Sequence, residues 1–214
     1  EVCRILRWFT EERDVQHHLS GCMVNLEEVS AIYFPYIIAW RNDPVNNRYL
    51  NQPFHLDMEK QRAWYEHYMV DITQGLLVVV DKENDTPFAT MGWTDYDAER
   101  HRCITGRLLV GDRRYRGSAH FAEATLLFAD YVYDTLGVDV CYAHIVRENA
   151  ASLRYHEKYG FHPNEGEMQF PEERIVNGME QVEYLRRRAD WCSVREAAVN
   201  RIDAARRNRR ERQG

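Results

Sequence analysis

The spacing of apolar residues predicts alternating helices and strands in the first third of the chain. Val2 to Phe9 fits a first strand, and a polar connection runs from Thr10 to Gly21. From about Leu26 to Arg41 apolar residues recur every three or four positions, which predicts a helix in two pieces, because Pro35 disturbs its interior. After the turn at Asp43 and Pro44, Asp57 can cap a second helix that runs to about Val70.

The next part of the chain has the pattern of a sheet. Leu76 to Val80 and Phe88 to Thr94 flank a polar turn and predict an antiparallel hairpin. Cys103 to Val110 predicts a third strand, Val138 to Val146 another, and Gln181 to Arg187 a closing strand. We therefore expect an α/β (α+β) fold in which helices flank a mixed, mostly antiparallel central sheet.

Two helices lie between the later strands. In the first, apolar residues share one face and Gly137 ends the helix; that face carries Phe121, Ala124, Phe128, Tyr131 and Thr135. The second runs from Ala150 to Tyr159, and Gly160 supplies its stop. The order of strand, basic glycine loop and helix is the order that a phosphate-binding turn requires.

The loop from Gly111 to Ser118 carries the first candidate chemistry. Amides at a helix start are unpaired and the helix dipole is positive there, so Arg114 to Ala119 suits a diphosphate. Gly117 allows close approach of the backbone, and Arg113, Arg114 and Arg116 can add charge-assisted contacts. An ordinary solvated surface loop remains the alternative.

The second candidate element begins at Asn149. This residue can cap the following helix, and Ser152 and His156 lie on the same face, three and seven positions further on. Tyr159-Gly160-Phe161 closes the helix with a glycine where a left-handed backbone is needed.

Together the two elements resemble the GNAT acetyltransferase superfamily. The resemblance rests on Arg114-Tyr-Arg-Gly117-Ser-Ala119 and on the segment from Asn149 to Gly160-Phe161, and more loosely on Ala39 to Pro44 and a terminal strand ending at Trp191. The stretch Trp40 to Pro44, with Gly111-Asp112, is most similar to the branch of ribosomal-protein N-terminal and amino-sugar-nucleotide acetyltransferases.

The resemblance implies binding of acetyl-CoA (acyl-CoA) as co-substrate and direct acyl transfer to an amine in a ternary complex. The implied cofactor-binding residues are Leu109 and Val110 for the pantetheine arm, Arg114, Arg116, Gly117, Ser118 and Ala119 for the diphosphate, and Asn149 with Ser152 beside the pantetheine. Trp40, Trp93 and Tyr96 are candidates for the acceptor pocket, with core packing as the alternative.

Two departures from the family pattern affect catalysis. Many relatives place a tyrosine seven residues after the asparagine as proton donor, whereas this chain has His156 there and Tyr155 one position earlier. A strand glutamate that serves relatives as base is replaced by Thr105. A proton acceptor could instead come from the loop with Asp95, Asp97, Glu99 and His101, of which Glu99 is our candidate, or from bulk water.

Length and composition indicate the domain organisation and limit the kinds of site to be expected. The 214 residues, 44% hydrophobic, suit one domain (1–192), followed by a basic helical or disordered tail (193–214) with seven arginines and three acidic residues. We expect no metal site, no membrane span, reduced cysteines and a cytoplasmic protein. Aromatic residues around Tyr33 to Tyr36 would suit a homodimer.

The sequence thus predicts an N-acetyltransferase that acts on a primary amine of a small molecule or amino-sugar nucleotide. One alternative keeps the fold but takes an acyl or aminoacyl group from RNA, which the basic tail could contact although the acidic body does not favour it. A second alternative is a protein that binds CoA without catalysis.

Overall fold

The computed structural model describes residues 18–213, apart from the side chains of Arg206 and of residues 208–213. The strand predicted for Val2 to Phe9 lies outside the described residues. Nine strands of the described part form one mixed sheet in the order β1-β2-β3-β4-β5-β6-β9-β7, with β8 paired to β9. The strands are β1 (His18–Ser20), β2 (Val24–Glu28), β3 (Gly75–Asp81), β4 (Thr86–Asp97), β5 (Arg102–Val110), β6 (Val140–Val146), β7 (His162–Pro163), β8 (Ile175–Val176) and β9 (Met179–Arg187).

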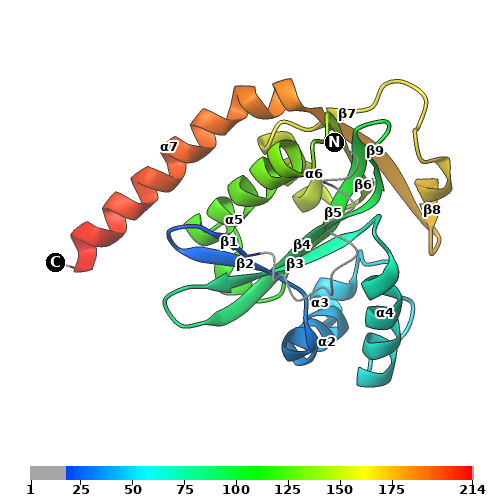
Figure 1. The fold of residues 1–214 in the computed structure, drawn as a ribbon, viewed down its shortest axis with the longest axis horizontal. Helices are drawn as coiled ribbons and strands as arrows, with labels where there is room; N and C mark the ends of the chain where they lie inside the picture. Colours follow the sequence, from blue (N-terminus) through cyan, green and yellow to red (C-terminus); the bar gives the residue numbers. More distant parts are fainter. Residues whose placement is uncertain (1–17, 214) are drawn as a thin grey trace.

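All strand pairs are antiparallel except β5 with β6, which run parallel. The predicted class, a mostly antiparallel sheet flanked by helices, is therefore confirmed. The helices are α2 (Phe34–Asn42), α3 (Pro44–Asn47), α4 (Met58–Val70), α5 (Ala119–Asp130), α6 (Ala150–Lys158) and α7 (Arg188–Gln213). Figure 1 shows α2, α3 and α4 grouped together, away from α5 and α7.

Each face of the sheet buries its own apolar core. On one face Leu76, Val78 and Val80 of β3 pack with Phe34 and Tyr68 of α2 and α4. On the other face the core contains Phe121, Ala124, Phe128 and Tyr131 of the predicted helix face, whereas Thr135, the fifth residue of that face, is exposed. Alternation along β3 sends its side chains to both cores, so a run of apolar residues is required there.

The segment from Leu26 to Arg41 differs from the prediction. Val24 and Leu26 are buried in β2, so this part has the two-residue period of a strand, and α2 begins only at Phe34. Pro35 falls in the first turn of α2, where its missing N–H costs no helical hydrogen bond, and it does not kink the helix interior. Tyr33 and Phe34 are buried, which leaves Tyr36 as the exposed aromatic of this segment.

Several local predictions are confirmed. Asp57 caps α4, and its side chain accepts a hydrogen bond from the backbone N–H of Lys60 (2.9 Å). The helix that begins with α5 continues through a π-helical turn (Tyr131–Thr135) and ends before Gly137, whose φ is +71°.

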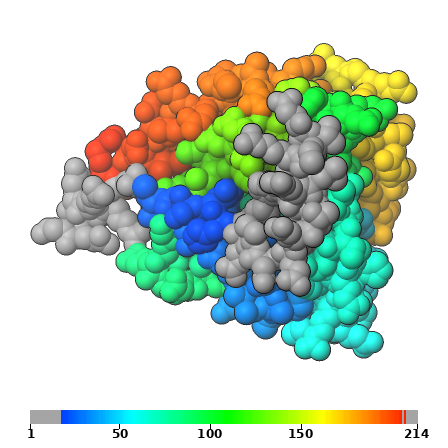
Figure 2. All heavy atoms as spheres, in the orientation of Figure 1, coloured from blue at the N-terminus to red at the C-terminus, as the bar shows by residue number. Residues whose placement is uncertain are grey.

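The C-terminal region differs in one respect. The closing strand ends at Arg187, and Trp191 lies in α7, where its indole N–H donates to Asp130 of α5 (2.9 Å). Trp191, Ala198 and Ile202 are buried, and Figures 1 and 2 show α7 continuing past α5 as an arm at the edge of the molecule. The division of the chain at residue 193 stays a prediction, and α7 runs across it without a break.

Candidate active site

The sheet opens between β5 and β6. Arg102, Cys103 and Ile104 pair with β6, and no later residue of β5 does so. Thr105 marks the last contact, because its hydroxyl donates to the carbonyl of Tyr142 (3.3 Å). From there β5 continues to pair with β4 only, through Leu109 and Val110. The backbone edge of these residues that faces away from β4 is therefore available to an extended ligand.

A β-bulge reshapes β5 at the same point. Gly106 pairs with Gly92 and Leu109 with Thr90, so the register shifts between them. Arg107 occupies the bulge with φ of +49°, and the hydroxyl of Thr90 donates to its carbonyl (2.8 Å). A Cβ added at Gly106 would meet no described atom within 4 Å, so the strand borders open space here.

The loop after β5 presents backbone amides at the start of α5. Asp112 accepts from the amide of Arg114 (3.0 Å), and Ser118 caps α5 by accepting from the amide of Phe121 (3.2 Å). The amide of Ser118 itself donates to the carbonyl of Tyr115 (3.1 Å). Gly117 has φ of +71°, and in the described structure the amides of Gly117 and Ala119 donate to no protein group. These two amides form the free part of the predicted anion cradle.

The arginines of this loop hold protein partners. Arg113 is paired with Asp43 (2.7 Å) and Arg114 with Asp112 (2.6 Å). Arg116 donates to the side-chain oxygen of Asn46 (2.6 Å). Arg113 and Arg114 are at least half exposed, and ion pairs of this kind contribute little, so these side chains can exchange partners for a phosphate.

Helix α6 follows the open edge and begins as predicted at Asn149. The Asn149 side chain accepts from the amide of Ser152 (3.2 Å), and Gly160, with φ of +86°, ends the helix. His156 is 7% exposed, and its Nδ1 donates to the carbonyl of Ser152 (2.8 Å). The three residues predicted to share a face are therefore joined by hydrogen bonds.

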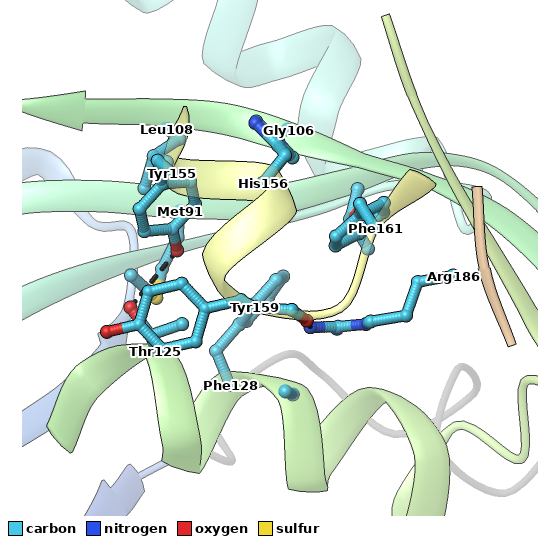
Figure 3. Close-up of a pocket in the computed structure, with 12 residues that line it drawn as sticks. Met91, Gly106, Leu108, Thr125, Phe128, Tyr155, His156, Tyr159, Phe161 and Arg186 are labelled. Atoms are coloured by element: carbon cyan, nitrogen blue, oxygen red, sulfur yellow. Dashed lines mark hydrogen bonds between the residues drawn. The ribbon is translucent and has the colours of Figure 1, made fainter. Parts of the chain in front are cut away.

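A cavity of about 30 Å³ lies where β5, α5 and α6 meet, as Figure 3 shows. Its lining comes from Met91 of β4, from Thr105, Gly106 and Leu108 of β5, from Thr125, Phe128 and Ala129 of α5, and from Tyr155, His156, Tyr159, Phe161 and Arg186. The structure thus brings both predicted catalytic residues of α6 to the opening of the sheet.

The protonation of these two residues is set by burial. Desolvation lowers the pKa of His156 to about 4, a shift that the Ser152 carbonyl opposes and the charge of Arg186 reinforces. Desolvation raises the pKa of Tyr155. The Thr125 hydroxyl already donates to the Phe121 carbonyl, so in the contact between the two hydroxyls (3.1 Å) Tyr155 is the donor and Thr125 the acceptor. Both side chains are therefore neutral at pH 7, with their protons engaged by protein groups.

The structure separates the other candidates from this cavity. Trp93 is buried among Phe128 and Tyr131 of the core, and the Tyr96 hydroxyl donates to the Leu136 carbonyl (2.8 Å). Glu99 lies in the exposed turn before β5, and about 13 Å of strand separate Arg102 from Gly106. A Cβ at Gly111 would meet the ring of Trp40 at 2.1 Å, so Trp40 supports the backbone that leads into the loop.

Two buried polar groups near the opening carry no sequence motif. Arg186 is 3% exposed, donates to the Tyr159 carbonyl (3.0 Å), and lies 4.4 Å from the ring centroid of Phe161. The Glu183 carboxylate accepts from His144 Nε2 (2.9 Å) and from loop amides. Alternation along β6 and β9 places His144 and Glu183 on the face away from α6, and only the three-dimensional pairing reveals them.

A sheet that opens beside an amide-rich helix start defines a fold that accepts an elongated ligand with a phosphate group. Residues 24–162 match the family described as the acetyltransferase (GNAT) domain, and the chain belongs to this family. It is therefore an acyl-CoA-dependent N-acetyltransferase. A comparison with curated protein sequences gives no match.

Solved structures show the same fold. The chain is similar to a GCN5-related N-acetyltransferase from Brucella melitensis (19% identity, TM-score 0.73, covering 87% of this chain and 86% of that one). It is also similar to the spermidine N-acetyltransferase of Vibrio cholerae in complex with CoA and spermine (13%, 0.67, 80% and 99%). A third similar structure is FdhC, a nucleotide-linked sugar GNAT (17%, 0.67, 90% and 98%).

The part of the chain that the structure describes contains neither a metal-binding cluster nor a membrane-spanning helix. No group of three or more His, Cys, Asp or Glu side chains there could hold a metal ion. No helix among residues 18–213 is long and apolar enough to cross a bilayer.

Proposed function

We propose that the chain transfers an acetyl group from acetyl-CoA to a primary amine of a small molecule or amino-sugar nucleotide, and that it belongs to the branch of ribosomal-protein N-terminal and amino-sugar-nucleotide acetyltransferases. One observation carries the proposal: β5 leaves β6 after Ile104, and the loop that follows β5 offers the free amides of Gly117 and Ala119. The similarity to FdhC supports the amino-sugar branch.

The residues present fit acetyl-CoA. The open space beside Gly106 leaves room for an extended chain along Leu109 and Val110, and the loop amides lie at the far end of the same strand. Arg114 and Arg116 would move from Asp112 and Asn46 to the diphosphate, and Asn149 and Ser152 would border the pantetheine. Fixing the phosphates aims the thioester, and orientation of this kind contributes several kcal/mol.

The acyl-CoA thioester supplies an activated carbonyl for attack by the amine. The amine must lose a proton, and we propose His144 as its acceptor in place of Glu99. Glu183 fixes the His144 tautomer by accepting from Nε2, which leaves Nδ1 without a proton, and no described residue bonds Nδ1. His144 is on the strand that borders the opening, on the face of the sheet away from α6, whereas Glu99 is in a distant turn.

Release of free thiol from acetyl-CoA tests the proposal. A panel of amino sugars, nucleotide-linked amino sugars, polyamines and peptides should yield thiol with at least one amine, and His144→Gln should lower kcat. His55→Gln, in an exposed loop, is the matched control. Stabilisation by acetyl-CoA without thiol from any amine would favour the non-catalytic alternative.

The RNA alternative has its own test. Truncation after residue 205 removes the last arginines, and RNA binding that depends on salt and disappears with the truncation would favour a donor other than acetyl-CoA. Unchanged turnover of acetyl-CoA in the truncated chain is the result that we expect.

A further inference from the structure

Two arginines lie on the face of the sheet that α2 and α4 cover. Arg107 projects from the bulge of β5, and Arg41 comes from the last turn of α2. The Arg107 Nη2 donates to the side-chain oxygen of Gln74, and the Arg41 Nε donates to that of Gln52 (2.6 Å). Desolvation by burial lowers the pKa of both groups, and the charge of Arg41 lowers that of Arg107 further. The positive charge of Arg41 is therefore felt at Arg107.

No described carboxylate forms an ion pair with either arginine. Asp71, which acts on Arg107 through space, uses its oxygens to accept from the Thr73 amide and hydroxyl (2.9 and 2.7 Å) and from Gln74 Nε2 (2.6 Å). Asp95 also acts on Arg107 only through space. Neutral amides thus accept from both half-buried arginines, where a carboxylate would neutralise the charge.

The guanidinium of Arg107 packs against aromatic rings and has one nitrogen, Nη1, without a hydrogen-bond partner among the described residues. Its guanidinium lies 5.6 Å from the ring centroid of Trp64, which in turn stacks on Tyr68 at 5.1 Å. The Arg107 Nη1 is buried and has no hydrogen-bond partner among the described residues. A buried donor without a partner costs about 1–3 kcal/mol, so a ligand that accepts a hydrogen bond from Nη1 would gain binding free energy by removing this cost.

The backbone conformation of Arg107 also supports a functional role for this residue. A φ of +49° is unfavourable for a long side chain by about 1–2 kcal/mol, although Gly106 next to it could take such a conformation freely. Strain that persists in this way is typical of residues that a site needs in one orientation. Here the bulge turns the Arg107 side chain towards Trp64 of α4, while Gly106 borders the cavity.

We propose that Arg107 binds an anionic group of the acceptor, so that the substrate is a primary amine that also carries a carboxylate or a phosphate. This inference rests on the proposed function, since it assigns the acceptor of the same site. A guanidinium fork matches the oxygens of either anion, and its charge repels polycations. Polyamines are therefore expected to be poor acceptors.

Paired acceptors that differ by one anion test the substrate class. Thiol release is measured with glucosamine and glucosamine 6-phosphate, with tyramine and tyrosine, and with spermidine. The anionic member of a pair should have a KM roughly 10- to 100-fold lower, which is the range of one charge-assisted contact. A lower KM for the neutral members or for spermidine would overturn the inference and leave the acetyltransferase activity standing.

Variants show whether Arg107 is responsible. Arg107→Gln should abolish the preference with little change in the KM for acetyl-CoA, and Arg107→Lys should retain part of it because it keeps the charge but not the fork. Arg62→Gln removes the same charge from the exposed side of α4 and is the matched control. An undiminished preference in Arg107→Gln would refute the assignment.

A binding experiment decides the case even if no amine in the panel reacts. With CoA present in excess, inorganic phosphate should raise the Tm of the unmodified protein and of Arg62→Gln, and it should raise that of Arg107→Gln clearly less. Equal shifts in all three would overturn the subsite. Failure of CoA itself to stabilise the protein would count against the proposed function instead.

Discussion

Burial of the His156 imidazole predicts how the stability of the folded protein depends on pH. In the unfolded chain a histidine binds a proton with a pKa of 6.5, whereas burial lowers the pKa of folded His156 to about 4. Below pH 6.5 the His156 imidazole therefore binds a proton in the unfolded state but not in the folded state. Stability falls until the imidazole of the folded state also protonates near pH 4. Each pKa unit corresponds to about 1.4 kcal/mol, so this one residue should cost about 3 kcal/mol between pH 7 and pH 4.

Urea denaturation of matched variants isolates this contribution. His156→Gln keeps a donor for the Ser152 carbonyl but has no titrating ring. Between pH 7 and pH 4 its free energy of unfolding should therefore fall by about 3 kcal/mol less than that of the unmodified protein. His67→Gln removes an exposed imidazole whose Nδ1 makes the same kind of contact with the carbonyl four residues earlier (2.7 Å), and it is the control. Carboxylates titrate equally in all three proteins and cancel in the differences.

Parallel pH curves for the unmodified protein and His156→Gln would refute the reasoning. They would mean that His156 protonates as readily in the folded as in the unfolded chain. If the pKa is about 4, only about one molecule in a thousand carries the imidazolium at pH 7, which makes His156 a poor donor to the leaving thiolate. Its neutral ring, held by Ser152, would then shape the cavity.

Three further predictions concern the opening, the loop and the buried carboxylate. Gly106→Val should leave the Tm nearly unchanged, because the added Cβ meets no described atom within 4 Å, yet abolish stabilisation by CoA; retained stabilisation would contradict this. Gly117→Ala should raise the KM for acetyl-CoA several-fold through backbone strain of about 1 kcal/mol, whereas Gly137→Ala, with the same φ of +71°, should leave KM unchanged. Glu183→Gln should lower the free energy of unfolding by about 2–4 kcal/mol in urea, compared with a negligible change for the exposed Glu167→Gln, and equal effects would disprove the buried role.

Local sequence signals predicted the elements that present the site. Asp57 and Asn149 act as helix caps, and Gly137 and Gly160 end helices with a positive φ, because caps and stops depend on the residues themselves and their nearest neighbours. The strand from Val24 to Glu28 was missed because five residues with two buried positions are too short to separate a period of two from a helical one.

Contacts between distant segments could not be predicted. Cys103 and Cys141 are far apart in the sequence but are register partners in the parallel pair, and Arg107 meets Gln74 and Trp64 only because a bulge turns it. Trp93 and Tyr96 looked suitable for an acceptor pocket, but the sequence cannot say which face of the sheet a side chain occupies after a bulge. The residues that would select the acceptor therefore emerge only in three dimensions.

A crystal structure with acetyl-CoA would show where the cofactor binds. We expect the diphosphate within hydrogen-bond distance of the Gly117 and Ala119 amides, and the pantetheine paired with the open edge of β5 at Leu109 and Val110. A nucleotide bound elsewhere, or a β5 edge that closes onto β6 when the ligand binds, would contradict this expectation.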